Sequence, residues 1–255
     1  MFIRRERSLK EFISFYPIVS ILIGINLLLW FMTDFLQLPI GYTIYNWGIG
    51  HNLSVYHGEY WRLVTPIFLH GGLGHLVFNS FALVLFAPAL EQMLGKIKFI
   101  IAYFLTGFIG NLGTYVIEPL AEIPHLGASG AIYGLFGIYI FMVFFRKDLI
   151  DPANAQIIKV IFLIGLVMTF IQPNINIAAH IFGFLGGFAI GPIILLNTRP
   201  FSMARNRPLR KKHFDGDITF DPNRWNKKRG KVRKNIFWIV FGLLVLIGFL
   251  SKFFK

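Results

Sequence analysis

Long apolar runs constrain this chain more than any other feature of its sequence. The hydrocarbon core of a bilayer is about 30 Å thick, so a helix that crosses it needs roughly 20 apolar residues. Runs of about this length lie at residues 15–35, 75–93, 97–117, 127–145, 155–172, 175–196 and 236–252. A spanning segment must satisfy its own backbone hydrogen bonds, so each run is expected to be helical. The sequence therefore predicts an all-α polytopic membrane protein.

The run at residues 15–35 follows Arg4, Arg5 and Arg7, as the apolar core of a signal peptide also follows basic residues. It is longer than the ~7 to 15 residues of such a core, and no small-residue cleavage site comes after it. We expect a retained first helix.

Lys and Arg residues gather on one side of the predicted topology. With a cytoplasmic N-terminus, 22 of the 25 lie on the cytoplasmic side, and Arg62, Lys252 and Lys255 lie outside. The positive-inside rule thus predicts a multi-pass protein of the cell membrane with an extracytoplasmic C-terminus. The net charge of +13 is explained by this distribution, so we expect no nucleic-acid partner.

The predicted helices divide the chain into four parts. Residues 1–14 are expected to be cytoplasmic, and residues 15–197 to form a core of six spanning helices. Residues 198–235 are expected to form a basic cytoplasmic linker, and residues 236–255 a seventh helix with an external tail. Basic segments beside a membrane bind anionic lipid, so we expect the linker to contact the bilayer surface.

Polar side chains are costly inside a bilayer, so those within the apolar runs are candidates for function. Asn79, Ser129 and His180 are the fifth, third and sixth residues of their predicted spans. At a rise of about 1.5 Å per residue, all three lie roughly 5 to 10 Å below the outer boundary. The remaining notable polar residues are expected to form hydrogen bonds between helices: Asn26, Thr106, Asn111 and Thr114.

Glycines favour a close approach of the helices that carry Ser129 and His180. Small residues at helical spacing let two helix backbones come near each other. Gly127 and Gly130 frame the serine, and Gly183 lies one turn from His180. The packing is therefore expected to bring the imidazole to the serine hydroxyl. The glycines at helical spacing are Gly130, Gly134 and Gly137 in one helix, and Gly183 and Gly187 in the other.

A serine beside a histidine is a candidate nucleophile, because a neutral imidazole can take the hydroxyl proton. No Asp or Glu lies at this depth, so we expect a Ser129–His180 dyad without an acidic third member. Tyr133, one turn after Ser129, is expected to stack on the imidazole. Donors to an oxyanion are expected from the Asn79 amide, from His75 and from the backbone N–H of Ser129.

Other chemistries are excluded by what the sequence lacks. The absence of cysteine removes a thiol nucleophile and thiolate metal sites. There is no His-Glu-x-x-His zinc motif, and no run contains the two aspartates of an aspartyl protease. We therefore expect neither a metal nor a cofactor. A transporter or channel would place its polar groups at the midplane, whereas the groups here cluster near the outer side.

Four stretches carry a resemblance to a known family. They are "EYWRLVTPIFLH" at 59–70, "HLVFNS" at 75–80, "GASG" at 127–130 followed by Tyr133, and "AHIFGFLGG" at 179–187. In these stretches and their order, the sequence resembles the rhomboid intramembrane serine proteases. The resemblance covers the six-helix core, and the seventh helix resembles the six-plus-one arrangement of some members.

The resemblance implies roles for individual residues. Ser129 would be the nucleophile and His180 the base, with Asn79 and His75 in the oxyanion hole and Tyr133 supporting the histidine. A further set corresponds to the structural motif of the family's first external loop, which lies partly in the membrane: Glu59, Trp61 and Arg62.

The resemblance also implies that the substrates are single-span or polytopic membrane proteins, cut near the outer face where their helices unwind easily. It implies lateral entry near the second and fifth helices, with residues 172–176 as a movable cap. The alternative is a catalytically silent rhomboid-like protein that binds transmembrane clients. Such relatives typically lack the catalytic serine or histidine, and this chain has both Ser129 and His180.

Overall fold

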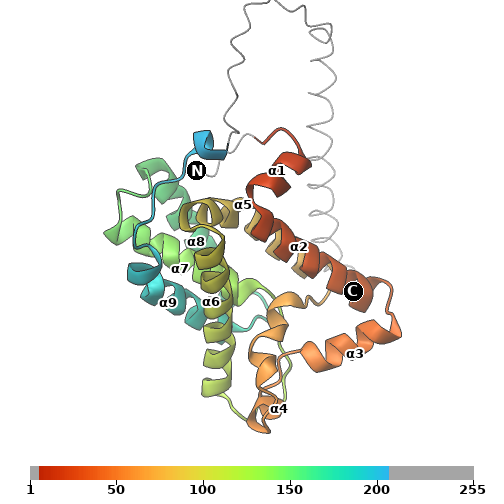
Figure 1. Cartoon of the computed structure of the whole chain (residues 1–255). Helices are drawn as coiled ribbons and strands as arrows, with labels where there is room; N and C mark the ends of the chain where they lie inside the picture. Colours follow the sequence, from red (N-terminus) through yellow and green to blue (C-terminus); the bar gives the residue numbers. More distant parts are fainter. Residues whose placement is uncertain (1–5, 207–255) are drawn as a thin grey trace, which may run out of the picture.

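The computed structural model describes residues 6–206, and within this range it is a bundle of helices (Figure 1). The only pairing of extended backbone in this range is an isolated bridge between Gly50 and His125. The all-α polytopic prediction is confirmed. The predicted helix at 236–252 and nearly all of the basic linker at 198–235 lie outside the described residues.

Six of the predicted spans correspond to helices. Among residues 6–206, five helices are long and apolar enough to cross a membrane, and α7 is a shorter apolar helix of 17 residues. In chain order the helices are α1 (Leu9–Phe15), α2 (Pro17–Trp30, continued by a π-helical turn at Phe31–Phe35), α3 (Pro39–Gly48), α4 (Asn52–Tyr56), α5 (Leu73–Leu94), α6 (Lys96–Ile117), α7 (Ser129–Phe145), α8 (Pro152–Ile171) and α9 (Ile177–Ile194). Short 3-10 turns lie at Tyr60–Leu63, Thr65–Phe68 and Met203–Asn206.

The ends of the helices differ from the predicted spans for local reasons. The span predicted from residue 127 begins at Ser129, because Gly127 has a φ of 126°, which a helix does not allow. The span predicted from 155 begins at Pro152, because the Asp151 side chain accepts from the Asn154 N–H and caps the helix. The span predicted from 175 begins at Ile177, where the Asn176 side chain caps α9.

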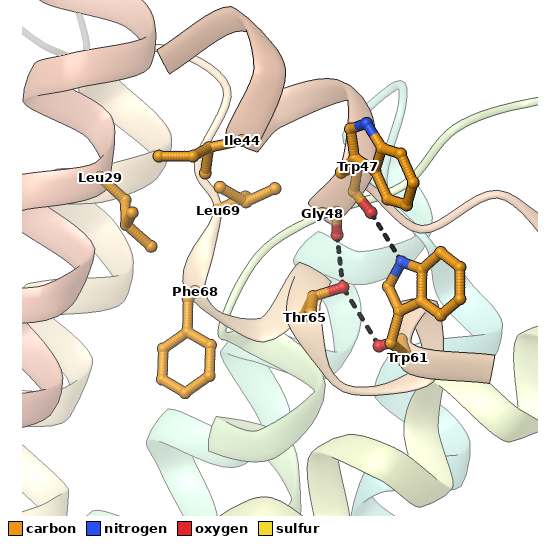
Figure 2. A pocket seen from close by; sticks show the side chains of 8 residues that line it. All are labelled: Leu29, Ile44, Trp47, Gly48, Trp61, Thr65, Phe68 and Leu69. Carbon is orange, nitrogen blue, oxygen red and sulfur yellow. Dashed lines mark hydrogen bonds between the residues drawn. The ribbon is translucent and has the colours of Figure 1, made fainter. Parts of the chain in front are cut away.

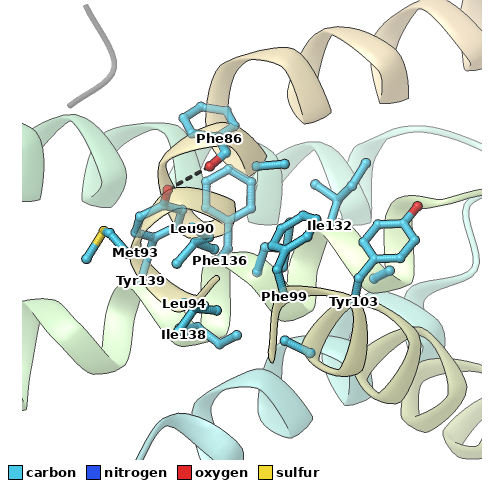
Figure 3. Close-up of a cluster of buried hydrophobic side chains, with 14 of the residues drawn as sticks. Phe86, Leu90, Met93, Leu94, Phe99, Tyr103, Ile132, Phe136, Ile138 and Tyr139 are labelled. Carbon is cyan, nitrogen blue, oxygen red and sulfur yellow. Dashed lines mark hydrogen bonds between the residues drawn. The ribbon is translucent and has the colours of Figure 1, made fainter. Parts of the chain in front are cut away.

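An apolar core fills the space between α5, α6 and α7 (Figure 3). Phe86 and Leu90 of α5 meet Phe136 and Tyr139 of α7 there, and Phe99 extends the core to α6. The Tyr139 hydroxyl donates to the Phe86 carbonyl at 2.6 Å, which satisfies the one polar atom of this side chain within the core.

The peripheral helices α2 and α8 turn most of their surface outward. In α8 the buried residues are Ile158 and Thr169, and Leu163 and Ile164 of the same helix are 59% and 57% exposed. An apolar surface of this kind is what a hydrocarbon environment stabilises.

In the part of the chain that the structure describes, one carboxylate is buried in a spanning helix, and the sequence did not single it out. Glu91 lies near the end of α5, and its two oxygens accept from the backbone N–H groups of Ile18 and Val19 at 3.0 and 2.9 Å. These donors belong to the first turn of α2, which has no intrahelical partners for them. Glu91 therefore joins α5 to α2 by capping a helix.

Candidate active site

The site is centred on a hydrogen bond between two helices. Ser129 is the first residue of α7, and its Oγ lies 2.8 Å from Nε2 of His180 in α9. His180 is buried, at 7% exposed, while Ser129 keeps partial access. The two residues that sequence analysis placed at one depth are in direct contact.

Backbone contact between α7 and α9 sets this distance. A methyl group on Gly183 would overlap the carbonyl oxygen of Gly130, and one on Gly187 would overlap the carbonyl oxygen of Gly134. The two helices thus touch through glycines along two successive turns, as their spacing predicted. Side chains of any size at these positions would push α9 away from the serine.

The Tyr133 ring lies flat against the imidazole. The centroids of the Tyr133 and His180 rings are 4.1 Å apart, and the ring planes differ by 16°. Tyr133 follows Ser129 by one turn of α7. The helix that carries the serine therefore also fixes the orientation of the imidazole ring, through the stacked Tyr133.

The other ring nitrogen of His180 meets a residue that sequence analysis missed. Nδ1 lies 2.9 Å from Oγ1 of Thr169, near the end of α8. Within residues 6–206, the hydrogen-bond partners of the imidazole are Ser129 and Thr169, and neither is a carboxylate. One feature of the sequence could have indicated Thr169. It lies within a turn before the short loop at 172–176, and His180 lies about one turn after the same loop.

His75 and Asn79 of α5 face the backbone just before Ser129. A methyl group on Gly127 would lie 2.6 Å from two atoms of the His75 ring and 3.7 Å from Nδ2 of Asn79. Gly127 therefore leaves both side chains room beside residues 127–129. Asn79 Nδ2 is buried and has no hydrogen-bond partner within the described structure. Because Ser129 is the first residue of α7, its backbone N–H also lacks an intrahelical acceptor.

The predicted structural loop lies away from the dyad and is internally bonded. Arg62 is buried, forms an ion pair with Glu59, and donates to the carbonyls of Asn46 and Ile49 at 2.8 and 2.7 Å. Trp61 donates to the Trp47 carbonyl at 3.0 Å, and the two indoles stack.

Backbone groups in and near this loop also form hydrogen bonds with the segment that leads to Ser129. The Gly127 N–H donates to the Pro66 carbonyl at 2.9 Å, and Gly50 exchanges both backbone hydrogen bonds with His125 at 2.9 Å. The residues just before Ser129 are therefore fixed on this loop.

A further histidine that sequence analysis missed borders the site. His70, in the loop before α5, is 1% exposed, and its ring lies edge-on to the His75 ring at 5.1 Å between centroids. Burial, together with the neighbouring His75, lowers the pKa of His70 to about 3. The imidazole is therefore neutral at pH 7, and it places no positive charge beside His75.

An apolar hollow of about 440 Å³ opens at another place, between α2, α3 and the turns before α5 (Figure 2). None of its lining residues belongs to α7, α8 or α9, so it is separate from the serine. It is lined by Leu29, Ile44, Trp47, Gly48, Trp61, Thr65, Phe68 and Leu69.

The described residues contain no group of three or more His, Asp or Glu side chains that could hold a metal ion. The contact between Ser129 Oγ and His180 Nε2 is an arrangement that can activate a hydroxyl. An imidazole touches the hydroxyl, and an unpaired amide donor and a helix-terminal N–H lie beside it. Fold and site together define an all-helical, multi-pass membrane protein with a paired serine and histidine inside the bundle.

Comparison with known proteins agrees with this class. The family model described as the Rhomboid domain matches residues 57–197, and the chain belongs to this family. It is 48% identical over 193 residues to "Putative rhomboid protease YdcA" of Bacillus subtilis, covering 74% of this chain and 94% of that protein. It is 36% identical over 146 residues to "Rhomboid protease GluP" of the same organism, covering 57% of this chain and 28% of that protein. "RHOMBOID-like protein 5" of Arabidopsis thaliana is 32% identical over 146 residues, covering 57% of this chain and 47% of that protein. Family and relatives support an intramembrane protease function.

Proposed function

We propose that the chain is a serine endopeptidase that hydrolyses peptide bonds in or near transmembrane segments, with Ser129 as nucleophile and His180 as base. The observation that carries the proposal is the 2.8 Å contact between Ser129 Oγ and His180 Nε2, with the imidazole held by a stacked Tyr133. A hydroxyl becomes a useful nucleophile when a neutral imidazole takes its proton.

The reaction follows from these positions. Ser129 Oγ forms a bond to the carbonyl carbon of the substrate as its proton moves to Nε2 of His180. The carbonyl oxygen becomes an anion, which Asn79 Nδ2, the Ser129 N–H and His75 would stabilise. The C–N bond then breaks, and the proton on Nε2 passes to the leaving nitrogen. Water, activated by the same imidazole, releases the acyl group from Ser129.

The substrate must be locally unwound before it can react. In a bilayer, a helical substrate keeps its amides in internal hydrogen bonds, which hides the carbonyl carbons from attack. We therefore propose membrane-protein substrates with segments that unwind easily, entering between α5 and α8. In this proposal the loop at 172–176 forms the cap.

We further propose that the protein lies in the cell membrane with its N-terminus in the cytoplasm and the dyad near the extracytoplasmic face. The distribution of Lys and Arg residues supports this orientation. The basic segment 198–235 would then contact anionic lipid on the cytoplasmic face.

A fluorophosphonate probe tests the proposal directly, because an activated serine attacks the probe and forms a lasting covalent bond with it. The purified protein in detergent is expected to be labelled once, at Ser129, and to cleave single-span substrates, with EDTA having no effect on either. Ser129→Ala should abolish both activities. His180→Ala should nearly abolish both, and the double variant should be about as inactive as either single variant.

The alternative, a silent protein that binds transmembrane clients, gives a different result. A folded wild-type protein that took no label and cut no member of a substrate panel, yet retained transmembrane clients on purification, would overturn the protease proposal. Labelling that persisted in His180→Ala would assign the base to another residue.

A further inference from the structure

Thr169 is a buried polar residue in a helix that otherwise faces outward. Its side chain is 1% exposed, and Ile158 is the other buried residue of α8. Its side chain points into the bundle and contacts residues of two other helices, Tyr133 of α7 and His180 of α9. The position of α8 beside the dyad is thus tied to one hydroxyl group.

Three groups lie within hydrogen-bonding distance of Oγ1 of Thr169. They are the Gly165 carbonyl at 2.9 Å, the Tyr133 hydroxyl at 2.7 Å and His180 Nδ1 at 2.9 Å. A hydroxyl has one hydrogen to donate and two lone pairs that accept. The Gly165 carbonyl can only accept, so all three bonds form together only if Thr169 donates to Gly165. Its lone pairs then accept from the Tyr133 O–H and from an N–H at Nδ1 of His180.

This assignment fixes the tautomer of the imidazole. A neutral imidazole with its proton on Nδ1 has its lone pair on Nε2, which faces Ser129 Oγ. In the opposite assignment, Thr169 donates to Nδ1, and the proton on Nε2 points at the serine. That tautomer cannot accept the serine proton, and it also leaves Thr169 with no hydrogen for Gly165.

We infer that Thr169 is a positioning residue that holds His180 in the tautomer a base requires. The inference rests on the proposed function, in which His180 takes the proton of Ser129. In serine proteases with a triad, a buried carboxylate does this from the same side of the imidazole. Here a neutral hydroxyl oxygen takes that place, so the imidazole is oriented without adding a charge inside the membrane. A displacement of α8 would release Nδ1.

Matched variants separate the hydroxyl from the shape of the side chain. Thr169→Ser keeps the hydroxyl, Thr169→Val keeps the shape, and Tyr133→Phe removes the second donor to Thr169 while keeping the stacked ring. We expect kcat within about twofold of wild type for Thr169→Ser, and about tenfold lower or more for Thr169→Val, as for loss of one buried hydrogen bond. KM should change little, since the substrate does not contact Thr169 in this scheme.

Nitrogen-15 NMR of protein carrying labelled histidine gives the readout that a packing defect would not produce. The His180 signals are identified by their absence in His180→Ala. Wild type, Thr169→Ser and Tyr133→Phe should show the proton on Nδ1, and Thr169→Val should shift it towards Nε2. If Thr169→Val does not fold, Thr169→Ala provides the same comparison.

The possible failures can be told apart. A Thr169→Val protein with wild-type kcat and the proton still on Nδ1 would overturn the role of Thr169, as would equal losses in Thr169→Val and Thr169→Ser. If wild type takes no fluorophosphonate and cuts nothing, the proposed function fails. The NMR measurement would then still report whether Thr169 sets the tautomer.

Discussion

At the scale of single residues, the site contains a polar group that the folded protein leaves without a partner. Asn79 Nδ2 is buried and unbonded within residues 6–206, which costs roughly 1 to 3 kcal/mol for an ordinary amide. By contrast, the amide nitrogen of Asn111 donates to the Leu63 carbonyl at 3.0 Å. In the proposed mechanism the Asn79 amide remains available for a group that arrives with the substrate, whereas the Asn111 amide stabilises the fold.

Asn79→Ala is therefore expected to lower kcat by about 10² to 10³, the effect of removing one oxyanion donor. The melting temperature in detergent should stay the same or rise, because an unpaired buried group is removed. Asn111→Ala serves as the control, because it should lower the melting temperature by leaving the Leu63 carbonyl unpaired. Full activity in Asn79→Ala would remove this residue from the mechanism.

At the scale of elements, the contact between α7 and α9 was predictable from the sequence, and the exact ends of the helices were not. Glycine spacing is local in sequence, and it correctly placed the two helices against each other. Gly127 has a positive φ, and the side chains of Asp151 and Asn176 act as helix caps. These features depend on where the chain turns, so the predicted ends were wrong by two or three residues.

Thr169 lay beyond the sequence argument for a different reason. A threonine in an apolar helix usually bonds to its own backbone, and Thr169 does so with Gly165. Only the rotation of α8 about its axis brings the remaining lone pairs to Tyr133 and His180. That rotation follows from packing, so the nearness of Thr169 to the loop at 172–176 indicates its depth in the membrane and not the direction of its side chain.

Gly183→Ala tests the helix contact. The added methyl group would overlap the Gly130 carbonyl, so α9 must shift, at a cost of roughly 1 to 3 kcal/mol for overpacking. We expect a lower melting temperature and slower fluorophosphonate labelling. Gly24→Ala in α2 is the matched control, since nothing lies within 4 Å of its added methyl group. Alanine there should be neutral or stabilise the helix by up to about 1 kcal/mol. Equal behaviour of the two variants would contradict the close approach of α7 and α9.

At the scale of the whole molecule, the proposed orientation assigns each loop to one side of the membrane. Glu122 and Lys147 are both exposed, and they flank α7 at its two ends. The chain has no cysteine of its own, so a single introduced thiol reports its location without a background signal.

Glu122→Cys should react with a membrane-impermeant maleimide in intact cells, whereas Lys147→Cys should react only after lysis. A reporter fused after Lys255 should be extracytoplasmic, and one inserted near Gly216 should be cytoplasmic, as the positive-inside rule predicts. Reporters at both of these positions on the same side would rule out a seventh spanning helix. Labelling of Lys147→Cys but not Glu122→Cys in intact cells would invert the proposed orientation.

The backbone contact between α7 and α9 also means that two parts of the sequence evolve under different constraints. Where carbonyl oxygens of α7 lie against glycines of α9, the spacing between Ser129 and His180 is set by backbone contact and not by the apolar side chains on the outward faces of the bundle. The outward faces of α2 and α8 are then free to diverge as host membranes change in thickness and lipid type. A descendant could replace most of the surface that meets its bilayer and still inherit the same distance between serine and histidine.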